Sequence, residues 1–290
     1  MVNYEFQEHM PAGTLYLVGT PIGNRGDWSV RAPFVLKNVS AILAEDTRVT
    51  GMLCQTYGIS TPLISFHEHN QERRIPEVIR RLETGDRLAL VSDRGMPTVS
   101  DPGQQLVDRV WEAGLTIRVV PGPSAVTTAF AASGFTHPFI FWGFLPRQRR
   151  QRDESLKMIT QMPWTVILYE APHRIKHTLT ELAKVLGADR SVLVAREMTK
   201  RFEEYRRQTL GELVTIEGWQ GELVIVIEPS AASDRKDEED EVPDWPVLEK
   251  MVRECVEQGQ KEKEAIRDIA SQWNINKREL YRKVQQAKLS

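Results

Sequence analysis

Two carboxylates and an arginine follow an early apolar run of the chain, in the stretch Ala44-Glu45-Asp46-Thr47-Arg48. Carboxylates can accept a proton from a reacting group, and an arginine can hold a phosphate or orient a carboxylate. The apolar run predicts a β-strand, and open α/β sheets bind ligands at the carboxyl ends of their strands. In the structural alternative, Asp46 caps the following helix and Arg48 is its surface partner, a role that is compatible with a site.

Two histidines form a second candidate group, in the stretch His67-Glu68-His69-Asn70. Alternate residues of a strand point to the same side, so His67 and His69 could face one pocket. No further ligand pattern accompanies them, which disfavours a metal site. Substrate contact or a polar turn is the favoured interpretation.

The most distinctive stretch is Ser92–Gly103, which packs turn-forming residues around Asp93 and Asp101 after an apolar run. A long polar loop at a strand end is more often a site than a spacer. The pair Asp101-Pro102 is also typical of a helix start.

Two turns rich in glycine and proline end other predicted strands, at Val18–Asn24 and Val120–Ala125. Glycine lets the backbone approach a ligand closely, but the same turns also fit tight packing between loops and helices. Neither turn matches the GxGxxG dinucleotide pattern, which argues against an NAD enzyme.

Alternating strands and helices must position these residues, and this alternation predicts an α/β fold. In the first block we expect strands at 14–18, 41–44, 63–66, 87–91, 116–120 and 139–142, and helices near 31–38, 47–57, 71–84, 103–113 and 123–133. An arginine-rich loop should follow. The second block should hold strands at 165–169, 191–196, 204–209 and 222–227, and a main helix over Pro172–Leu186 that Gly187 closes.

The end of the chain has a different character. Residues 229–243 are acidic and are interpreted as a linker. Apolar residues at helical spacing then predict three short helices, with a turn at Trp273–Asn276 before a basic last helix, as in helix-turn-helix modules. The predicted domains are therefore 1–138 and 139–228, both α/β, followed by the linker and a helix-turn-helix-like tail over 244–290.

The composition of the 290 residues, 41% hydrophobic with a net charge of −2, is typical of a globular protein and does not by itself indicate a nucleic-acid binder. Positive charge is nevertheless clustered, at Arg147, Arg149, Arg150 and Arg152 and again at Lys277, Arg278, Arg282 and Lys283. We expect a cytoplasmic protein with no membrane partner, because no apolar run could span a bilayer and the first residues lack a signal pattern. The two cysteines, far apart in sequence, provide neither a zinc pair nor a disulfide framework.

Together the motifs resemble a known family. In order along residues 13–228, they are TPIGN, AEDTR, HEHN, SDxGxPxxSDPG, VPGPSA, YEAPHR, AREMTK and GELVIVIE. This series resembles the tetrapyrrole-methylase superfamily, and within it the family of 16S ribosomal RNA cytidine-2'-O-methyltransferases. AEDTR with SDxGxPxxSDPG is particularly specific to the rRNA branch, and the basic C-terminal helices look like the tail of that family.

The resemblance implies a class III methyltransferase, commonly a homodimer, that binds S-adenosylmethionine (SAM) in a cleft between two α/β domains. Carried over motif by motif, the residues expected around SAM are Pro21, Asp93, Gly95, Met96, Val99, Ser124, Ala125, Tyr169, Ala195 and Glu197. The family usually has alanine and threonine where this chain has Arg94 and Met96. Arg94 could contact the SAM carboxylate, an RNA phosphate or solvent.

The resemblance also implies methylation of the ribose 2'-hydroxyl of cytidine 1402 in 16S rRNA, within the 30S subunit. That hydroxyl must lose a proton, and the candidate bases are Asp46, Glu45, Asp101 and His67, with Arg48 holding a phosphate or orienting a carboxylate. No metal is required, because SAM carries its own activated leaving group. The two basic clusters are suitable phosphate contacts, and the alternative for each is a solvated surface without a partner.

Two alternatives remain. A precorrin-type tetrapyrrole methyltransferase would share the fold and the cofactor, but a small macrocycle needs neither the arginine loop nor the basic tail. A SAM-responsive regulator that binds nucleic acid would explain the tail, but the long series of cleft motifs favours catalysis.

Overall fold

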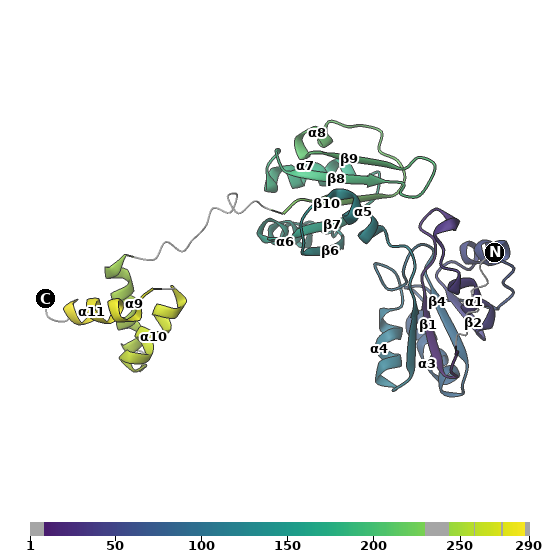
Figure 1. The fold of residues 1–290 in the computed structure, drawn as a ribbon, viewed down its shortest axis with the longest axis horizontal. Helices are drawn as coiled ribbons and strands as arrows, with labels where there is room; N and C mark the ends of the chain where they lie inside the picture. Colours follow the sequence, from purple (N-terminus) through teal and green to yellow (C-terminus); the bar gives the residue numbers. More distant parts are fainter. Residues whose placement is uncertain (1–8, 230–243, 258, 274, 288–290) are drawn as a thin grey trace. The chain divides into compact units, whose positions relative to one another are not determined.

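A computed structural model describes residues 9–229, 244–257, 259–273 and 275–287. The chain forms two compact units, Met1–Pro229 and Ser230–Ser290. The first unit contains two five-stranded sheets, and the second consists of helices (Figure 1). The α/β fold class and the helical C-terminal region predicted from the sequence are confirmed.

The first sheet is parallel throughout, in the order β3-β2-β4-β1-β5. Its strands are β1 (Thr14–Val18), β2 (Ala41–Ala44), β3 (Leu63–Ser65), β4 (Arg87–Val91) and β5 (Thr116–Val120). Its helices are α1 (Arg31–Asn38), α2 (Thr47–Thr56), α3 (Gln71–Glu83) and α4 (Gln104–Glu112), with a short 3-10 turn at Arg25–Asp27. Because all five strands run the same way, the motifs that follow them meet at one edge of the sheet.

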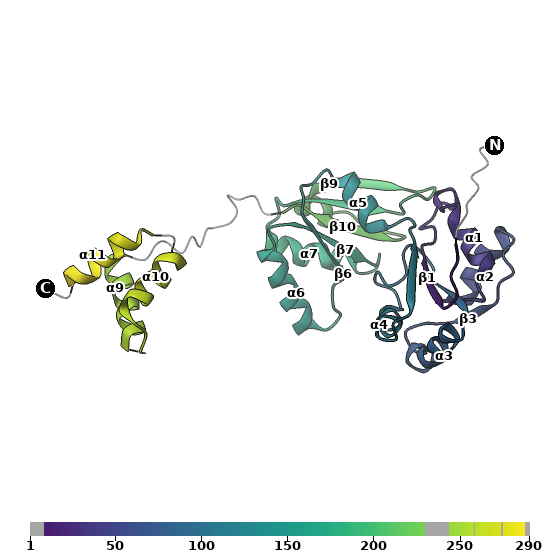
Figure 2. The ribbon, with the colours of Figure 1, turned by 60° about the horizontal axis from the view of Figure 1, so that its bottom comes forward.

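Helices cover both faces of this sheet, which explains why its strands are nearly continuous apolar runs. Successive residues of β1 alternate between two cores: Tyr16 packs with α1 and α2, and Leu15 packs with α3 and α4. The two helix pairs accordingly lie on opposite sides of the sheet (Figure 2).

The second sheet is mixed, in the order β6-β7-β10-β8-β9. Its strands are β6 (Phe139–Phe144), β7 (Thr165–Glu170), β8 (Ser191–Arg196), β9 (Glu204–Thr209) and β10 (Leu223–Ile227). Helices α6 (Arg149–Gln161), α7 (Ile175–Leu186) and α8 (Leu210–Val214) pack on one face. Helix α5 (Ala125–Ser133), which follows the first sheet, packs on the other face beside β10 and β8.

One predicted loop was wrong. The arginine-rich segment between the two blocks begins helix α6 at Arg149, and that helix continues to Gln161. The helix was not predicted because most of its residues are polar and its apolar stripe is short. That stripe includes Leu156 and Ile159 and packs onto α7. Helix α8 was also not predicted, because it spans only five residues; Thr209 and Glu212 close it with a capping box.

The second unit contains α9 (Trp245–Glu257), α10 (Glu262–Gln272) and α11 (Lys277–Ala287). All three predicted helices are present. Each helix contributes to one small core, which includes Leu248, Ile266 and Leu280. This unit therefore has an apolar core of its own, separate from that of the two sheets.

Candidate active site

The loops after β1, β4 and β5 are tied together at the carboxyl edge of the first sheet. Thr20 and Gly95 exchange backbone hydrogen bonds of 2.8 and 3.2 Å. A Cβ atom at Gly19 would lie 2.6 Å from the Cα of Gly122, so both positions require glycine. Of the two interpretations of these turns, tight loop packing therefore explains Gly19 and Gly122, while Ile22 lines a cavity further along the same loop.

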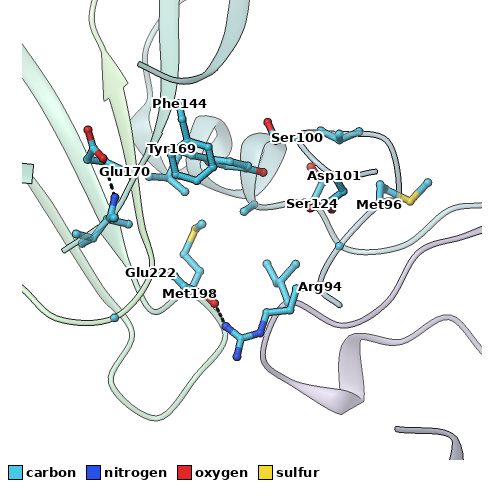
Figure 3. Close-up of a pocket in the computed structure, with 18 of the residues that line it drawn as sticks. Arg94, Met96, Ser100, Asp101, Ser124, Phe144, Tyr169, Glu170, Met198 and Glu222 are labelled. Atoms are coloured by element: carbon cyan, nitrogen blue, oxygen red, sulfur yellow. Dashed lines mark hydrogen bonds and ion pairs between the residues drawn. The ribbon is translucent and has the colours of Figure 1, made fainter. Parts of the chain in front are cut away.

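A predominantly apolar cavity of about 350 Å³ lies between the two sheets of the first unit (Figure 3). Six of the residues expected around a cofactor line it: Gly95, Met96, Val99, Ser124, Ala125 and Tyr169. The remaining wall comes from Ile22, Arg94, Ser100, Asp101, Phe144, Glu170–Pro172, Met198 and Gly221–Val224. Residues such as Val224 escaped prediction because an apolar strand residue carries no sign of whether it faces a core or a ligand.

The other four expected residues do not line this cavity. Pro21 is buried in its loop, and Ala195 is fully buried in the aromatic core beneath α5. Asp93 accepts a hydrogen bond of 3.1 Å from the backbone N–H of Asp46. Glu197 accepts bonds from the backbone of Glu222 and from Lys200, at 2.9 and 2.7 Å. The last two residues hold the loops around the cavity in place.

A second, polar cavity of about 540 Å³ lies beside the ends of β2 and β3. Its lining residues are Glu45, His67–His69, Gln71 and Ser100–Gln105. Ser100 and Asp101 line both cavities, so the loop after β4 forms a common wall. Glu45, His67 and Asp101, which were predicted as separate motifs, therefore meet around one polar space.

Asp101 has the most perturbed carboxyl group of the site. Burial is the main cause and the nearby charges of Glu45 and Asp93 add to it, so the pKa of Asp101 rises from 3.8 to about 7. Burial and Asp101 also raise the pKa of the Tyr169 phenol to about 12. Near neutral pH, Asp101 can thus exchange a proton while Tyr169 remains a hydrogen-bond donor.

Asp46 and Arg48 form a pair of their own. The Asp46 carboxylate accepts the Arg48 backbone N–H at 2.8 Å and two guanidinium bonds of 3.0 and 2.6 Å. These bonds hold the pKa of Asp46 at about 2, which makes it a weak base. Neither residue lines either cavity. Asp46 caps α2, as the structural alternative proposed.

The two histidines lie in the turn after β3. The side chain of Asn70 holds His67: its Oδ1 accepts the His67 backbone N–H at 2.9 Å, and its amide nitrogen Nδ2 lies 3.2 Å from His67 Nε2. The amide nitrogen is a donor, so Nε2 is the acceptor and a neutral His67 carries its proton on Nδ1. The rings of His67 and His69 meet edge to face at 5.9 Å.

Arg94 and Glu222 form an ion pair between the loop after β4 and the residue before β10 (Figure 3). Glu222 also pairs with Lys200 at 2.9 Å. The sequence left the SAM carboxylate, an RNA phosphate and solvent as possible contacts of Arg94 and did not predict Glu222. In the structure Arg94 joins the first sheet to the second at the wall of the apolar cavity. Both side chains remain about half exposed.

Three of the four clustered arginines, Arg147, Arg149 and Arg150, are exposed. Arg152 is the exception and corrects the expectation of an RNA contact: it is buried, pairs with Glu181 at 2.5 Å and donates to Thr178 at 2.8 Å. It faces inward because α6 turns its side chain toward α7. In the second unit, α11 exposes Lys277, Arg278 and Arg282, and Lys283 lies 5.8 Å from the ring centre of Trp245.

Among the residues that the structure describes, no group of three or more histidine, cysteine, aspartate or glutamate side chains could hold a metal ion. Over the same ranges, no helix combines the length and apolar character needed to cross a membrane.

Known proteins share this architecture. The sequence profile of the family described as Tetrapyrrole (Corrin/Porphyrin) Methylases matches residues 14–214. Two solved structures have the same fold: a methyltransferase called CobJ, with a TM-score of 0.60 at 18% identity over 76% of this chain and 95% of that one, and a diphthine synthase, with a TM-score of 0.59 at 16% identity over 74% and 90%. The fold and the cleft thus define a tetrapyrrole methylase of the class III methyltransferase type.

Curated relatives narrow the assignment. The ribosomal RNA small subunit methyltransferase I of Bacillus subtilis (strain 168) is 43% identical over 276 residues, which are 93% of each chain. The protein of the same name from Synechocystis sp. is 42% identical over 273 residues, covering 93% of this chain and 96% of that one. The chain belongs to the ribosomal RNA small subunit methyltransferase I family, as the motif series predicted.

Enzymes of this family use SAM as methyl donor. The apolar cavity fits such a cofactor, because Ile22, Met198 and Val224 offer apolar surface to a flat purine and the ion pair of Arg94 and Glu222 offers charged groups. The small residues Ser124 and Ala125 line the same space.

Proposed function

We propose that this protein methylates the ribose 2'-hydroxyl of a cytidine in 16S rRNA, with cytidine 1402 as the target. The observation that carries the proposal is the wall shared by the two cavities, where Asp101 borders an apolar space suited to a cofactor and a polar space suited to a ribose. The names of the curated relatives support rRNA as the substrate.

SAM, when bound in the apolar cavity, supplies a methyl group on a positively charged sulfur. The walls of the two cavities orient the hydroxyl and the methyl donor toward one another, and such orientation can contribute about 7–11 kcal/mol to catalysis. Asp101 accepts the proton that the hydroxyl loses. Its pKa of about 7 suits a general base near neutral pH, a role worth roughly 10²–10⁴-fold in rate.

Other side chains of the site support Asp101. Tyr169 remains a phenol and can donate a hydrogen bond to an oxygen beside it. The carboxylate of Glu45, with its own pKa raised mainly by burial, keeps the pKa of Asp101 high and lines the path of the proton to solvent. His67 contacts the nucleotide in the polar cavity, and Arg48 holds a phosphate at the surface beside it.

The RNA is held outside the cavities by exposed cations. Arg147, Arg149 and Arg150 contact phosphates beside the cleft, and Lys277, Arg278, Arg282 and Lys283 of the C-terminal unit contact phosphates further along the RNA. We propose that the substrate is 16S rRNA within the 30S subunit, and that the active enzyme is a homodimer.

Labelled SAM offered with 30S subunits, with naked 16S rRNA and with a precorrin-type tetrapyrrole tests this function. We expect label in 16S rRNA at a position that resists alkaline hydrolysis, because a methylated 2'-hydroxyl cannot attack the neighbouring phosphate. Label in the base, or only in the macrocycle, would contradict the proposal. The Asp101→Asn variant is the control, since it retains the shape of the wall and lacks the base.

Deletion of residues 244–290 separates the two proposed binding regions. The C-terminal unit has its own core, so its removal leaves the two sheets intact. We expect the KM for 30S subunits to rise at least tenfold at 150 mM salt while the affinity for S-adenosylhomocysteine stays unchanged. Equal losses of both would contradict a role in RNA binding.

A further inference from the structure

Phe144 is an exposed aromatic residue at the end of strand β6. About half of its surface is open to solvent, and the ring lines the apolar cavity. Its neighbour Leu145 is almost completely buried. Single exposed aromatic residues are common, but one that also lines a cavity is placed to contact a ligand there.

A β-bulge produces this placement. Phe141 of β6 pairs with Ile167 of β7, but the next pair is Gly143 with Leu168, so one residue of β6 is extra. Because side chains alternate along a strand, this extra residue turns Phe144 to the face of Tyr169; without it, Phe144 would point into the core beneath α6 and α7. Gly143 provides the required positive φ of 78°.

The bulged segment is held firmly on both sides. Tyr169 meets the Phe144 ring at 5.6 Å, and Phe141 packs on Tyr169 at 4.8 Å. Arg174 donates to the carbonyl oxygen of Leu145 at 2.8 Å. The ring of Phe144 therefore lies beside that of Tyr169 (Figure 3), and about half of the residue remains exposed.

The segment also lies against the wall that the two cavities share. A Cβ atom on Gly143 would come within 3.2 Å of the Ser100 hydroxyl, next to Asp101. On its other side, Phe144 is followed within a few residues by Arg147 and Arg149, which are exposed. An exposed ring that lines the same cavity as Asp101 and is followed in the chain by exposed cations offers the groups that bind a nucleotide with an unstacked base.

We propose that Phe144 stacks on the base of the target nucleotide and so holds its ribose against Asp101, an inference that rests on the proposed function. The 2'-hydroxyls of an RNA helix lie along its shallow minor groove, whereas Asp101 lies in the wall of recessed cavities. A nucleotide that brings its ribose to Asp101 therefore swings out of its stack, and an aromatic face replaces the lost contact. Every base has a flat face, so Phe144 can position the nucleotide whatever its base, while the polar cavity receives the ribose.

Three variants test this role: Phe144→Ala, Phe144→Leu and Phe144→Tyr. Leucine retains apolar volume without an aromatic face, and tyrosine retains the face. Trp111→Ala is the matched control, because Trp111 is also an exposed aromatic residue and lines neither cavity. The measurements are kcat and KM with 30S subunits, and the affinity for S-adenosylhomocysteine by calorimetry.

We expect kcat/KM for 30S subunits to fall about 10- to 100-fold for both alanine and leucine, since base stacking on an aromatic ring typically contributes a factor in this range. Tyrosine should restore the activity. Phe144 also borders the cofactor cavity, so the informative variant is leucine, which retains apolar volume and whose affinity for S-adenosylhomocysteine should fall by less than its kcat/KM. Full activity of the leucine variant would overturn the proposal, as would a loss of cofactor affinity in that variant as large as its loss of kcat/KM, because Phe144 would then act only through the cofactor. If the unaltered protein does not methylate rRNA, the proposed function itself fails.

Discussion

Replacement of Asp101 by asparagine should slow catalysis and stabilise the fold, because the Asp101 carboxylate accepts a proton in the reaction but its burial destabilises the folded protein. As the proposed general base, Asp101 should contribute roughly 10²–10⁴-fold to the rate, so we expect kcat to fall by that factor. The wild-type rate should decline below pH 7, where the carboxyl becomes protonated, and the residual rate of the variant should not follow this titration.

The same substitution should stabilise the protein at high pH. A rise of the Asp101 pKa from 3.8 to about 7 corresponds to a ceiling of about 4 kcal/mol, at about 1.4 kcal/mol per pKa unit. We discount this to about 2 kcal/mol, because the side chain borders two open cavities where solvent screens its charge. The destabilisation by the Asp101 carboxylate is absent below about pH 4, the pKa of Asp101 in the unfolded chain. It grows as the pH rises and is complete above pH 7.

Thermal unfolding of the protein without cofactor, followed from pH 4 to pH 8.5, measures this difference. We expect the melting temperature of Asp101→Asn to exceed that of the wild type by about 4–8 °C at pH 8 and to approach it near pH 4. Ser100→Ala is the matched control: it alters the same wall but removes no charge. A loss of activity without a pH-dependent gain in stability would refute the reasoning, since the pKa of Asp101 would then not be raised in the folded protein.

Three further predictions follow from neighbouring contacts. Glu45→Gln removes a negative charge near Asp101, so the midpoint of the pH–rate profile should move to lower pH by less than one unit. Arg94→Ala breaks an exposed ion pair in the wall of the cofactor cavity, worth about 0.2–1 kcal/mol. Without this pair, S-adenosylhomocysteine should leave the cavity up to about fivefold faster, which stopped-flow fluorescence measures. Salt at 0.5 M should abolish the difference between variant and wild type, because it screens the pair. Arg152→Ala breaks a buried pair and should reduce the free energy of unfolding in urea by about 3 kcal/mol, whereas Arg149→Ala should leave it unchanged and weaken binding to 30S subunits.

The fold could be predicted well because its strands are short apolar runs that turn signals separate. The predicted bounds of β1 and β2 agree with the structure at both ends. Prediction from local sequence was wrong where tertiary packing determines the secondary structure. Helix α6 is the example: its first turn contains arginines, which are equally common in surface loops. Arg152 resembles Arg149 and Arg150 in sequence, but its position on the helix places it against Glu181.

The candidate site was only partly predictable for a related reason. A motif identifies the loop that reaches the edge of the sheet, as with Gly95 and Ser124, which do line the cavity. It does not identify which residue of a loop faces inward: Ile22 lines the cavity and Pro21 beside it does not. Phe144 gave no signal at all, because its orientation depends on a bulge in the pairing of two strands.

The carboxylates show most clearly why sequence proximity does not reveal chemical role. Asp46 and Asp101 are the same residue type, and both follow strands of the first sheet. Hydrogen bonds from Arg48 bring the pKa of Asp46 to about 2, whereas burial and two neighbouring carboxylates bring that of Asp101 to about 7. At neutral pH the first group is a fixed negative charge and the second can take up a proton. Asp101 is therefore the group at which methyl transfer to a hydroxyl should depend on pH, and exchanging the two environments would exchange the two roles.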